Sequence, residues 1–130
     1  MKVLQPQGWA RPKGYSNGIA ARGEMVFVSG MVGWNENGKL VGKDFLSQAK
    51  QALKNVVTVL AAASVLPENI VRMNWYVLDK DEYLAAQKNL GRVYREIIGA
   101  HYPAMTAVQV VALVEEGARV EIEVTAVIPA

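Results

Sequence analysis

The chain contains no cysteine and only one histidine, His101. The absence of cysteine excludes disulfide bonds, thiolate nucleophiles and cysteine-based zinc or iron–sulfur sites. A metal site built on His101 would also need carboxylates, and the sequence shows no such cluster. We therefore expect a function that uses no metal ion.

Long apolar runs and blocks of basic residues are also missing. No run approaches the ~20 apolar residues that cross a bilayer, so we expect no membrane association. The first residues lack the basic-then-apolar pattern of an export signal, which predicts a cytoplasmic protein. Fourteen Lys and Arg residues against twelve Asp and Glu give a net charge of only +2, and they are scattered. We therefore do not expect a nucleic-acid partner.

Hydrophobic residues, in contrast, are abundant at 52% of the 130 residues. This length fits one domain, residues 1–130, and is too short for two independent cores. An apolar surplus in a small domain favours burial between subunits, so the composition predicts an oligomer.

The pattern of apolar residues predicts two helices. The first begins at an Asp44 N-cap and ends before Pro67. The second begins at Asp79, which forms a capping box with Glu82, and ends near Gly99. Both have one apolar face.

Alternating or β-rich stretches predict the strands, while residues 1–17 are rich in Pro and Gly and predict an irregular arm. The predicted strands are two short ones within 18–33 that turn at Arg22–Gly23, one at 70–78, and two at 104–113 and 119–127. The order ββ-α-β-α-ββ predicts an α+β, two-layer domain in which both helices cover one face of a single mixed sheet. The other face carries apolar residues too, and self-association would cover it.

Five segments, taken in their order and spacing, carry a resemblance that spans nearly the whole chain. They are "GYSNGI" (14–19), "VFVSGMVG" (26–33), "QAKQALKNV" (48–56), "YPA" (102–104) and "VEIEVTAV" (120–127). Together they resemble the RidA/YjgF family of imine deaminases, also known as L-PSP endoribonucleases. The resemblance implies a chorismate-mutase-like homotrimer with a cleft between each pair of subunits. It further implies hydrolysis of a 2-imino acid, or its 2-enamino tautomer, to a 2-keto acid and ammonia, with no cofactor.

The same resemblance implies two catalytic residues, Glu121 and Tyr15, and a serine–glycine backbone, Ser29 and Gly30, that binds substrate. Imine hydrolysis needs a water that attacks an electrophilic carbon and a proton that reaches nitrogen. Glu121 is suited to orient or deprotonate that water. From the residues alone, an ordinary solvent-facing strand glutamate is the better explanation of Glu121, since it alternates with apolar neighbours; the resemblance reverses that preference.

Met105 stands where the family has the arginine that pairs with the substrate carboxylate. We expect Met105, Thr106 and Ala107 to line the substrate site, with Ala107 offering its carbonyl and Trp34 suiting a large ligand. Gly91 falls where the family often has a helix asparagine. The alternative interpretation of Met105 is a core methionine.

The missing arginine predicts altered specificity. An arginine binds a carboxylate through two charge-assisted hydrogen bonds, and methionine has no donor. Loss of a charged partner in a desolvated site costs about 2–5 kcal/mol, which is ~30-fold to several-thousand-fold in affinity. We therefore expect either another cation, with Arg11, Lys13 and Arg119 as candidates, or a larger and less polar ligand that packs on the thioether.

Three functions remain open from the sequence. The first is an imine/enamine deaminase with non-archetypal specificity, for which a 2-aminomuconate-like or bulkier substrate is a candidate. The second is a non-catalytic trimer that binds a metabolite, which the missing arginine favours. The third is an endoribonuclease, which the near-neutral charge and single histidine disfavour.

Overall fold

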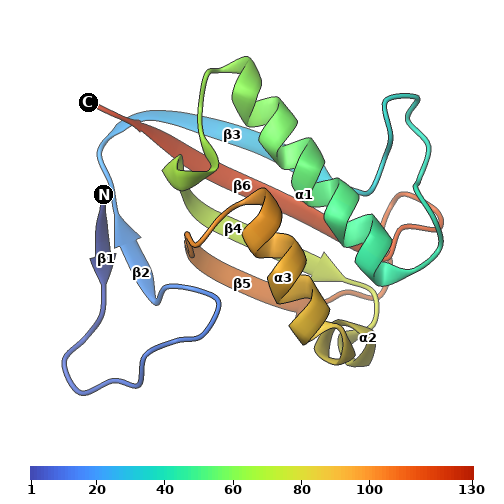
Figure 1. Ribbon diagram of the computed structural model, residues 1–130, viewed down its shortest axis with the longest axis horizontal. Coiled ribbons are helices and arrows are strands. Elements are labelled where there is room, and N and C mark those ends of the chain that lie inside the picture. Colours follow the sequence, from blue (N-terminus) through green and yellow to red (C-terminus); the bar gives the residue numbers. More distant parts are fainter.

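The computed structural model describes all 130 residues, and Figure 1 shows a curved main sheet behind two main helices, with a small sheet of β1 and β2 to one side. None of the helices combines the length and apolar character that crossing a bilayer requires. The elements are β1 (Lys2–Leu4), β2 (Gly18–Ala20), β3 (Gly23–Met31), α1 (Phe45–Ala62), the 3-10 helix η1 (Pro67–Asn69), β4 (Ile70–Val77), α2 (Lys80–Ala85), α3 (Gln87–Ile97), β5 (Ala104–Gln109) and β6 (Val120–Pro129).

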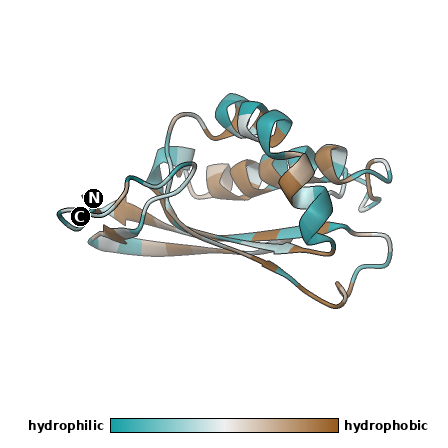
Figure 2. Ribbon diagram, turned by 90° about the horizontal axis from the view of Figure 1, so that it is seen from below, coloured by the Kyte–Doolittle hydropathy of each residue, from teal (hydrophilic) through white to brown (hydrophobic).

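The main sheet has the strand order β3-β6-β4-β5. The β4–β5 pair is parallel, whereas β6 is antiparallel to both β3 and β4. Figure 2 shows the helices on one side of this sheet only. The predicted α+β class, with a mixed sheet and helices on one face, is confirmed.

The core fills the space between the sheet and the helices. Helix α1 begins as predicted, because the Asp44 side chain accepts a hydrogen bond from the Ser47 backbone N–H at 3.0 Å. Its apolar face packs on β6 and β3. The largest fully buried apolar side chains are Leu53, Leu60, Ile70, Met73 and Ile122.

The opposite face of the sheet is covered by no other element of the chain. Phe27 and Met25 on β3 are 70% and 56% exposed there. Beside them, β6 presents the carboxylates Glu121 and Glu123, which are half-buried. We refer to this surface as the open face.

The N-terminal arm is more ordered than the sequence predicts. We expected residues 1–17 to be irregular and the strand at 18–20 to turn back on its successor. Instead, β2 pairs with β1 in a separate two-stranded sheet, and β3 pairs with β6. The chain passes from β2 to β3 through Gly23, whose φ is +148° and where a Cβ would overlap the Ile128 carbonyl. Only glycine fits there, and it separates the two strands.

The second predicted helix is two helices, with a break at Ala86. Asp79 is the N-cap as predicted, since its side chain accepts from the backbone N–H groups of Asp81 and Glu82. The predicted capping box is wrong, because the Glu82 carboxylate bonds to Arg119 Nε at 2.8 Å instead. A charged donor binds a carboxylate more strongly than a neutral backbone N–H.

The buried side chain of Gln48 connects helix α1 to the loop before it and to the loop that leads into β6. Gln48 on α1 is fully buried and donates to the carbonyls of Gly42 and Gly117. Its Oε1 accepts from the Arg119 backbone N–H at 2.7 Å. The side chain therefore holds two loops and the start of β6 on the helix.

We expect Gln48→Met to lower the free energy of unfolding by about 2–4 kcal/mol. The apolar replacement leaves partly buried backbone groups of Arg119 and Gly117 without partners, and each such group costs about 1–3 kcal/mol. Urea denaturation followed by circular dichroism measures the change. Lys50→Met, at an exposed position of the same helix, is the control and should change stability by less than about 0.5 kcal/mol.

Candidate functional site

Parallel pairing of β4 and β5 sets the position of Met105. Met105 lies opposite Met73, and Ala107 lies opposite Trp75. Met105 therefore points to the helix side of the sheet, where it is half-buried against the core. Met105 was expected to be either a core residue or a residue that lines the site. Both descriptions apply, because its side chain packs against the core and also lines a cavity.

The N-terminal arm is fastened to the start of β5. The backbone N–H of Ser16 donates to the Pro103 carbonyl at 3.0 Å, and the Ser16 hydroxyl donates to the Tyr102 carbonyl. Ser16 also forms a parallel bridge with Ala104. This attachment places Lys13, Gly14 and Tyr15 over the free edge of the sheet.

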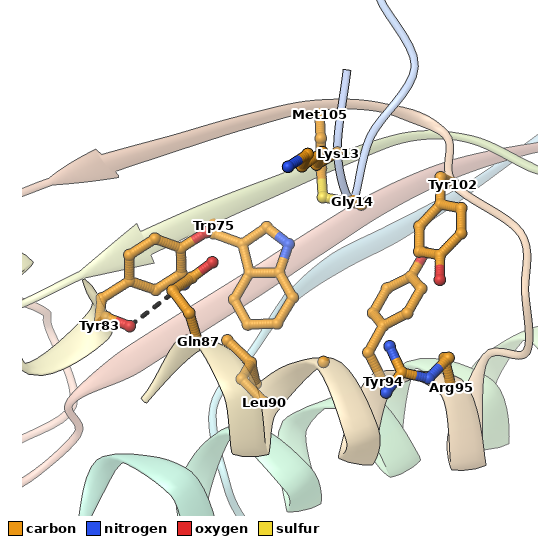
Figure 3. Close-up of a pocket in the computed structure, with 11 residues that line it drawn as sticks. Lys13, Gly14, Trp75, Tyr83, Gln87, Leu90, Tyr94, Arg95, Tyr102 and Met105 are labelled. Carbon is orange, nitrogen blue, oxygen red and sulfur yellow. Dashed lines mark hydrogen bonds between the residues drawn. The ribbon is translucent and has the colours of Figure 1, made fainter. Parts of the chain in front are cut away.

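Two adjoining hollows result: an outer cleft, and a second hollow against the buried side chains of Trp75, Leu90 and Tyr94, which we call the inner cavity. The outer cleft is lined by Lys13, Gly14, Tyr15, Tyr83, Gln87, Met105 and Ala107. The inner cavity has a volume of about 260 Å³ and lies between β4–β5 and α3 (Figure 3). Lys13, Gly14, Tyr83, Gln87 and Met105 line both, and the inner cavity adds Trp75, Leu90, Gly91, Tyr94, Arg95 and Tyr102.

Two tyrosines form one wall of the inner cavity. The rings of Tyr94 and Tyr102 stack with centroids 5.5 Å apart, and the Tyr94 hydroxyl donates to the His101 carbonyl at 2.6 Å. Burial, followed by the neighbouring Tyr102, raises the pKa of Tyr94 well above its usual value. The Tyr94 hydroxyl therefore stays protonated and keeps its hydrogen bond to the His101 carbonyl, which holds the two rings in place. His101 itself bonds to the Ile70 carbonyl at 2.7 Å through Nε2.

The helix amide at the cleft is Gln87, which the sequence reasoning missed. Gly91 does line the inner cavity, but it has no side chain to contact a ligand. Asn89 accepts a hydrogen bond from Arg92 on the exposed side of α3. Gln87 lines both the cleft and the cavity, and its Nε2 donates to the Tyr83 carbonyl at 3.1 Å. The signal was its position four residues after Tyr83, on the same helical face.

The second group of candidate residues gathers around Gly30. The β3–β6 register shifts between Val28 and Met31, so Ser29 and Gly30 lie in a bulge. A Cβ at Gly30 would overlap the Glu121 carboxylate. Glycine is therefore what allows Glu121 to lie directly against the backbone of the bulge.

These two groups lie at opposite edges of the sheet. Strands β3 and β5 are separated by three strand spacings, or ~14 Å. Glu121, opposite Tyr76, lies on the open face, whereas Met105 lies on the helix face. Within one chain, the two groups therefore face opposite sides of the sheet.

The remaining predicted site residues lie apart from Met105. Thr106 is exposed and, by the alternation of β5, faces the open side of the sheet. Trp34 forms a bridge with Leu40 beyond the end of β3 and borders a hollow against α1. The structure brings Tyr15, Met105 and Ala107 together, and separately Ser29, Gly30 and Glu121.

Of the three candidate replacement cations, Lys13 alone borders Met105. Arg119 is paired with Glu82, and Arg11 borders a different hollow beside His101. The inner cavity holds one further cation, Arg95 on α3, which the sequence reasoning missed.

Glu123 on the open face is held by two donors. The Tyr76 hydroxyl donates to its Oε1 at 2.5 Å and Asn74 Nδ2 donates at 3.0 Å. The hydrogen bond from Tyr76, then that from Asn74, lowers the pKa of Glu123. The same bond raises the pKa of Tyr76. Glu123 is thus an ionised structural carboxylate, whereas Glu121 has no donor in the chain.

Comparison with known proteins identifies the class. Residues 9–128 match the family model described as Endoribonuclease L-PSP. Because this match covers most of the chain, the protein belongs to that family, which is also the RidA/YjgF family that its segments resemble.

Individual relatives agree with this assignment. A human protein named 2-iminobutanoate/2-iminopropanoate deaminase is 32% identical over 78% of this chain and 72% of its own length. The crystal structure of YyfB from Yersinia pestis, a Rid-family protein of unknown function, is 32% identical with a TM-score of 0.83, covering 98% of both chains. Escherichia coli TdcF, solved with bound serine, is 28% identical with a TM-score of 0.71, again over 98% of both chains.

We expect Tyr76→Phe to destabilise the protein by about 1 kcal/mol at pH 7, because a half-buried carboxylate loses its main donor. A lowered pKa stabilises the fold above the ordinary value of 4.5, and this contribution is lost as pH falls through the folded pKa. The difference between the proteins should therefore shrink as the pH falls below 4.5. Urea titrations at several pH values and one protein concentration measure it. Tyr15→Phe, whose hydroxyl has no partner in the fold, is the control, and a pH-independent difference would contradict the assignment.

Proposed function

We propose that this protein is an imine/enamine deaminase that hydrolyses a 2-imino or enamino compound to the keto compound and ammonia. The observation that supports it most is the Glu121 carboxylate, which lies against the Gly30 bulge with no hydrogen-bond donor of its own chain. A carboxylate without a partner is free to bind water. Membership of the family and the names of the curated relatives support the same activity.

Imine hydrolysis requires only a positioned water and a group that transfers its proton. Water adds its oxygen to the imine carbon, and Glu121 accepts a proton from that water. The proton passes to nitrogen, the C–N bond breaks, and both protons of the water leave with nitrogen as ammonia. Ser29 and Gly30 supply backbone groups beside the carboxylate, and Tyr15 supplies a hydroxyl from the outer cleft.

A complete site needs a second copy of the chain. Tyr15, Met105 and Ala107 lie at one edge of the sheet, and Ser29, Gly30 and Glu121 lie at the other. A homotrimer that brings the β3 edge of one subunit to the β5 edge of the next would join them. The exposed Phe27 and Met25 on the open face support such an association.

A non-catalytic, metabolite-binding trimer is the second candidate. The position at the centre of the cleft carries Met105, which has no donor for a substrate carboxylate. A relative, TdcF, was solved with bound serine, so a ligand that is not an imine can bind in this family.

We expect Glu121→Gln to lower kcat for imine hydrolysis at least about a hundredfold, because the amide cannot accept the proton of the attacking water. The assay measures ammonia released from imines generated in situ. Glu116→Gln, in the exposed loop before β6, is the control and should keep full activity.

Light scattering decides whether the loss is chemical. The variant should remain a trimer, like the parent protein. A monomeric parent would remove the joint cleft, and unchanged turnover by the trimeric variant would assign Glu121 a structural role.

We also expect Met105→Arg to raise kcat/KM for 2-iminopropanoate at least about tenfold, because a guanidinium forms two charge-assisted bonds with the carboxylate. The same change fills the entrance of the inner cavity, so turnover of bulkier imines should fall. Met105→Leu separates charge from volume and should not improve the small imine. A variant that remains inactive on every imine would favour the metabolite-binding alternative.

A further inference from the structure

The inner cavity has a lining that the chemistry at Glu121 does not explain. Two cations, Lys13 and Arg95, border it, and no carboxylate does. The rest of the wall is largely aromatic, formed by Trp75, Tyr83 and the stacked pair of tyrosines. An aromatic cavity with unbalanced positive charge selects an anion with a flat apolar body.

A buried donor in this cavity has no partner. Trp75 is 3% exposed, and its indole Nε1 is the one buried side-chain nitrogen or oxygen without a hydrogen bond. Figure 3 shows the nitrogen edge of the indole turned into the space between Trp75 and Tyr102. Buried polar groups are normally satisfied, so this donor indicates an acceptor on a ligand.

The two cations reach the cavity from different walls. Lys13 comes from the N-terminal arm beside Met105, whereas Arg95 comes from α3 beside Tyr94 (Figure 3). Lys13 also borders the outer cleft, but Arg95 borders only the inner cavity. A ligand with a single compact carboxylate would pair with only one of these two cations. A ligand with a carboxylate at each end would pair with both.

Gly91 lies beside Arg95 in the wall of the inner cavity. A Cβ at this position would lie 3.4 Å from Arg95 Nη1. Glycine inside a helix costs about 1 kcal/mol relative to alanine, so its presence in α3 needs a reason. Here the missing side chain lowers the α3 wall of the cavity, and Arg95 Nη1 is the one atom of another side chain near that position.

We infer that the inner cavity binds an unsaturated or aromatic dicarboxylate, with one carboxylate at Lys13 near the cleft and the other at Arg95. Trp75 and the tyrosines pack on the flat body, and the indole N–H donates to an oxygen of the ligand. As a substrate class this rests on the proposed function: the substrate is then a 2-imino or 2-enamino dicarboxylate whose distal end enters the inner cavity.

The test is binding of an inert diacid, which needs no turnover. Isothermal titration calorimetry compares 1,4-phenylenediacetate with (4-methylphenyl)acetate, which has the same ring and one carboxylate fewer. We expect the diacid to bind at least about tenfold more tightly, because it alone engages both cations. The saturated 1,4-cyclohexanediacetate should bind more weakly than the aromatic diacid, because its body is not flat.

Variants locate the site. Lys13→Ala and Arg95→Ala should each remove most of the preference for the diacid, whereas Lys88→Ala and Arg92→Ala, on α3 but outside the lining, should preserve it. Trp75→Phe should weaken both ligands, because it removes the indole N–H. Equal affinity for the two acids, or equal losses in the control variants, would overturn the inference. Tight diacid binding without ammonia release from any imine would leave the inference standing and defeat the proposed deaminase.

Discussion

The parallel pairing of β4 with β5 is the constraint on which the site depends. Parallel neighbours cannot be joined by a tight turn, so the chain must cross over the sheet between them, and α2 and α3 make that crossing. The crossover lays α3 above β4 and β5 and encloses the inner cavity. The same register puts Met105 next to Met73, on the helix side. Had β5 been antiparallel, a short hairpin would have sufficed and no helix would lie over it.

The β5 side and the β3 side of the sheet carry different functional groups. At the β5 edge, two hydrogen bonds from Ser16 hold the N-terminal arm, which brings cationic and phenolic groups over Met105. At the β3 edge, a bulge with a glycine leaves space for the Glu121 carboxylate. The cleft at Met105 and the Glu121 carboxylate are thus built at separate places by local features. In the proposed homotrimer, repetition around an axis would bring them together.

Much of the architecture could be predicted from the sequence, because it depends on local signals. The Asp44 and Asp79 caps, the stop before Pro67 and the apolar periodicity fixed both helical regions and the sheet class. The failures were non-local. The N-terminal residues Lys2–Leu4 pair with β2 across an intervening loop, and Glu82 accepts hydrogen bonds from Arg119, which is distant in sequence, instead of completing the capping box. Arg95 and Gln87 were missed because only the crossover brings α3 to Met105.

Met105 takes on a different meaning once the cavity behind it is known. Judged alone, a methionine offers no donor for a ligand carboxylate. Met105 also lines the inner cavity together with Gly91 and Trp75, so the cleft adjoins an aromatic cavity with an unpaired indole donor and two cations. An arginine at 105 would add a third positive charge to this lining. Under the proposed function, the methionine and the cavity behind it would act together and favour ligands that extend beneath α3 over ligands held at the edge of the sheet.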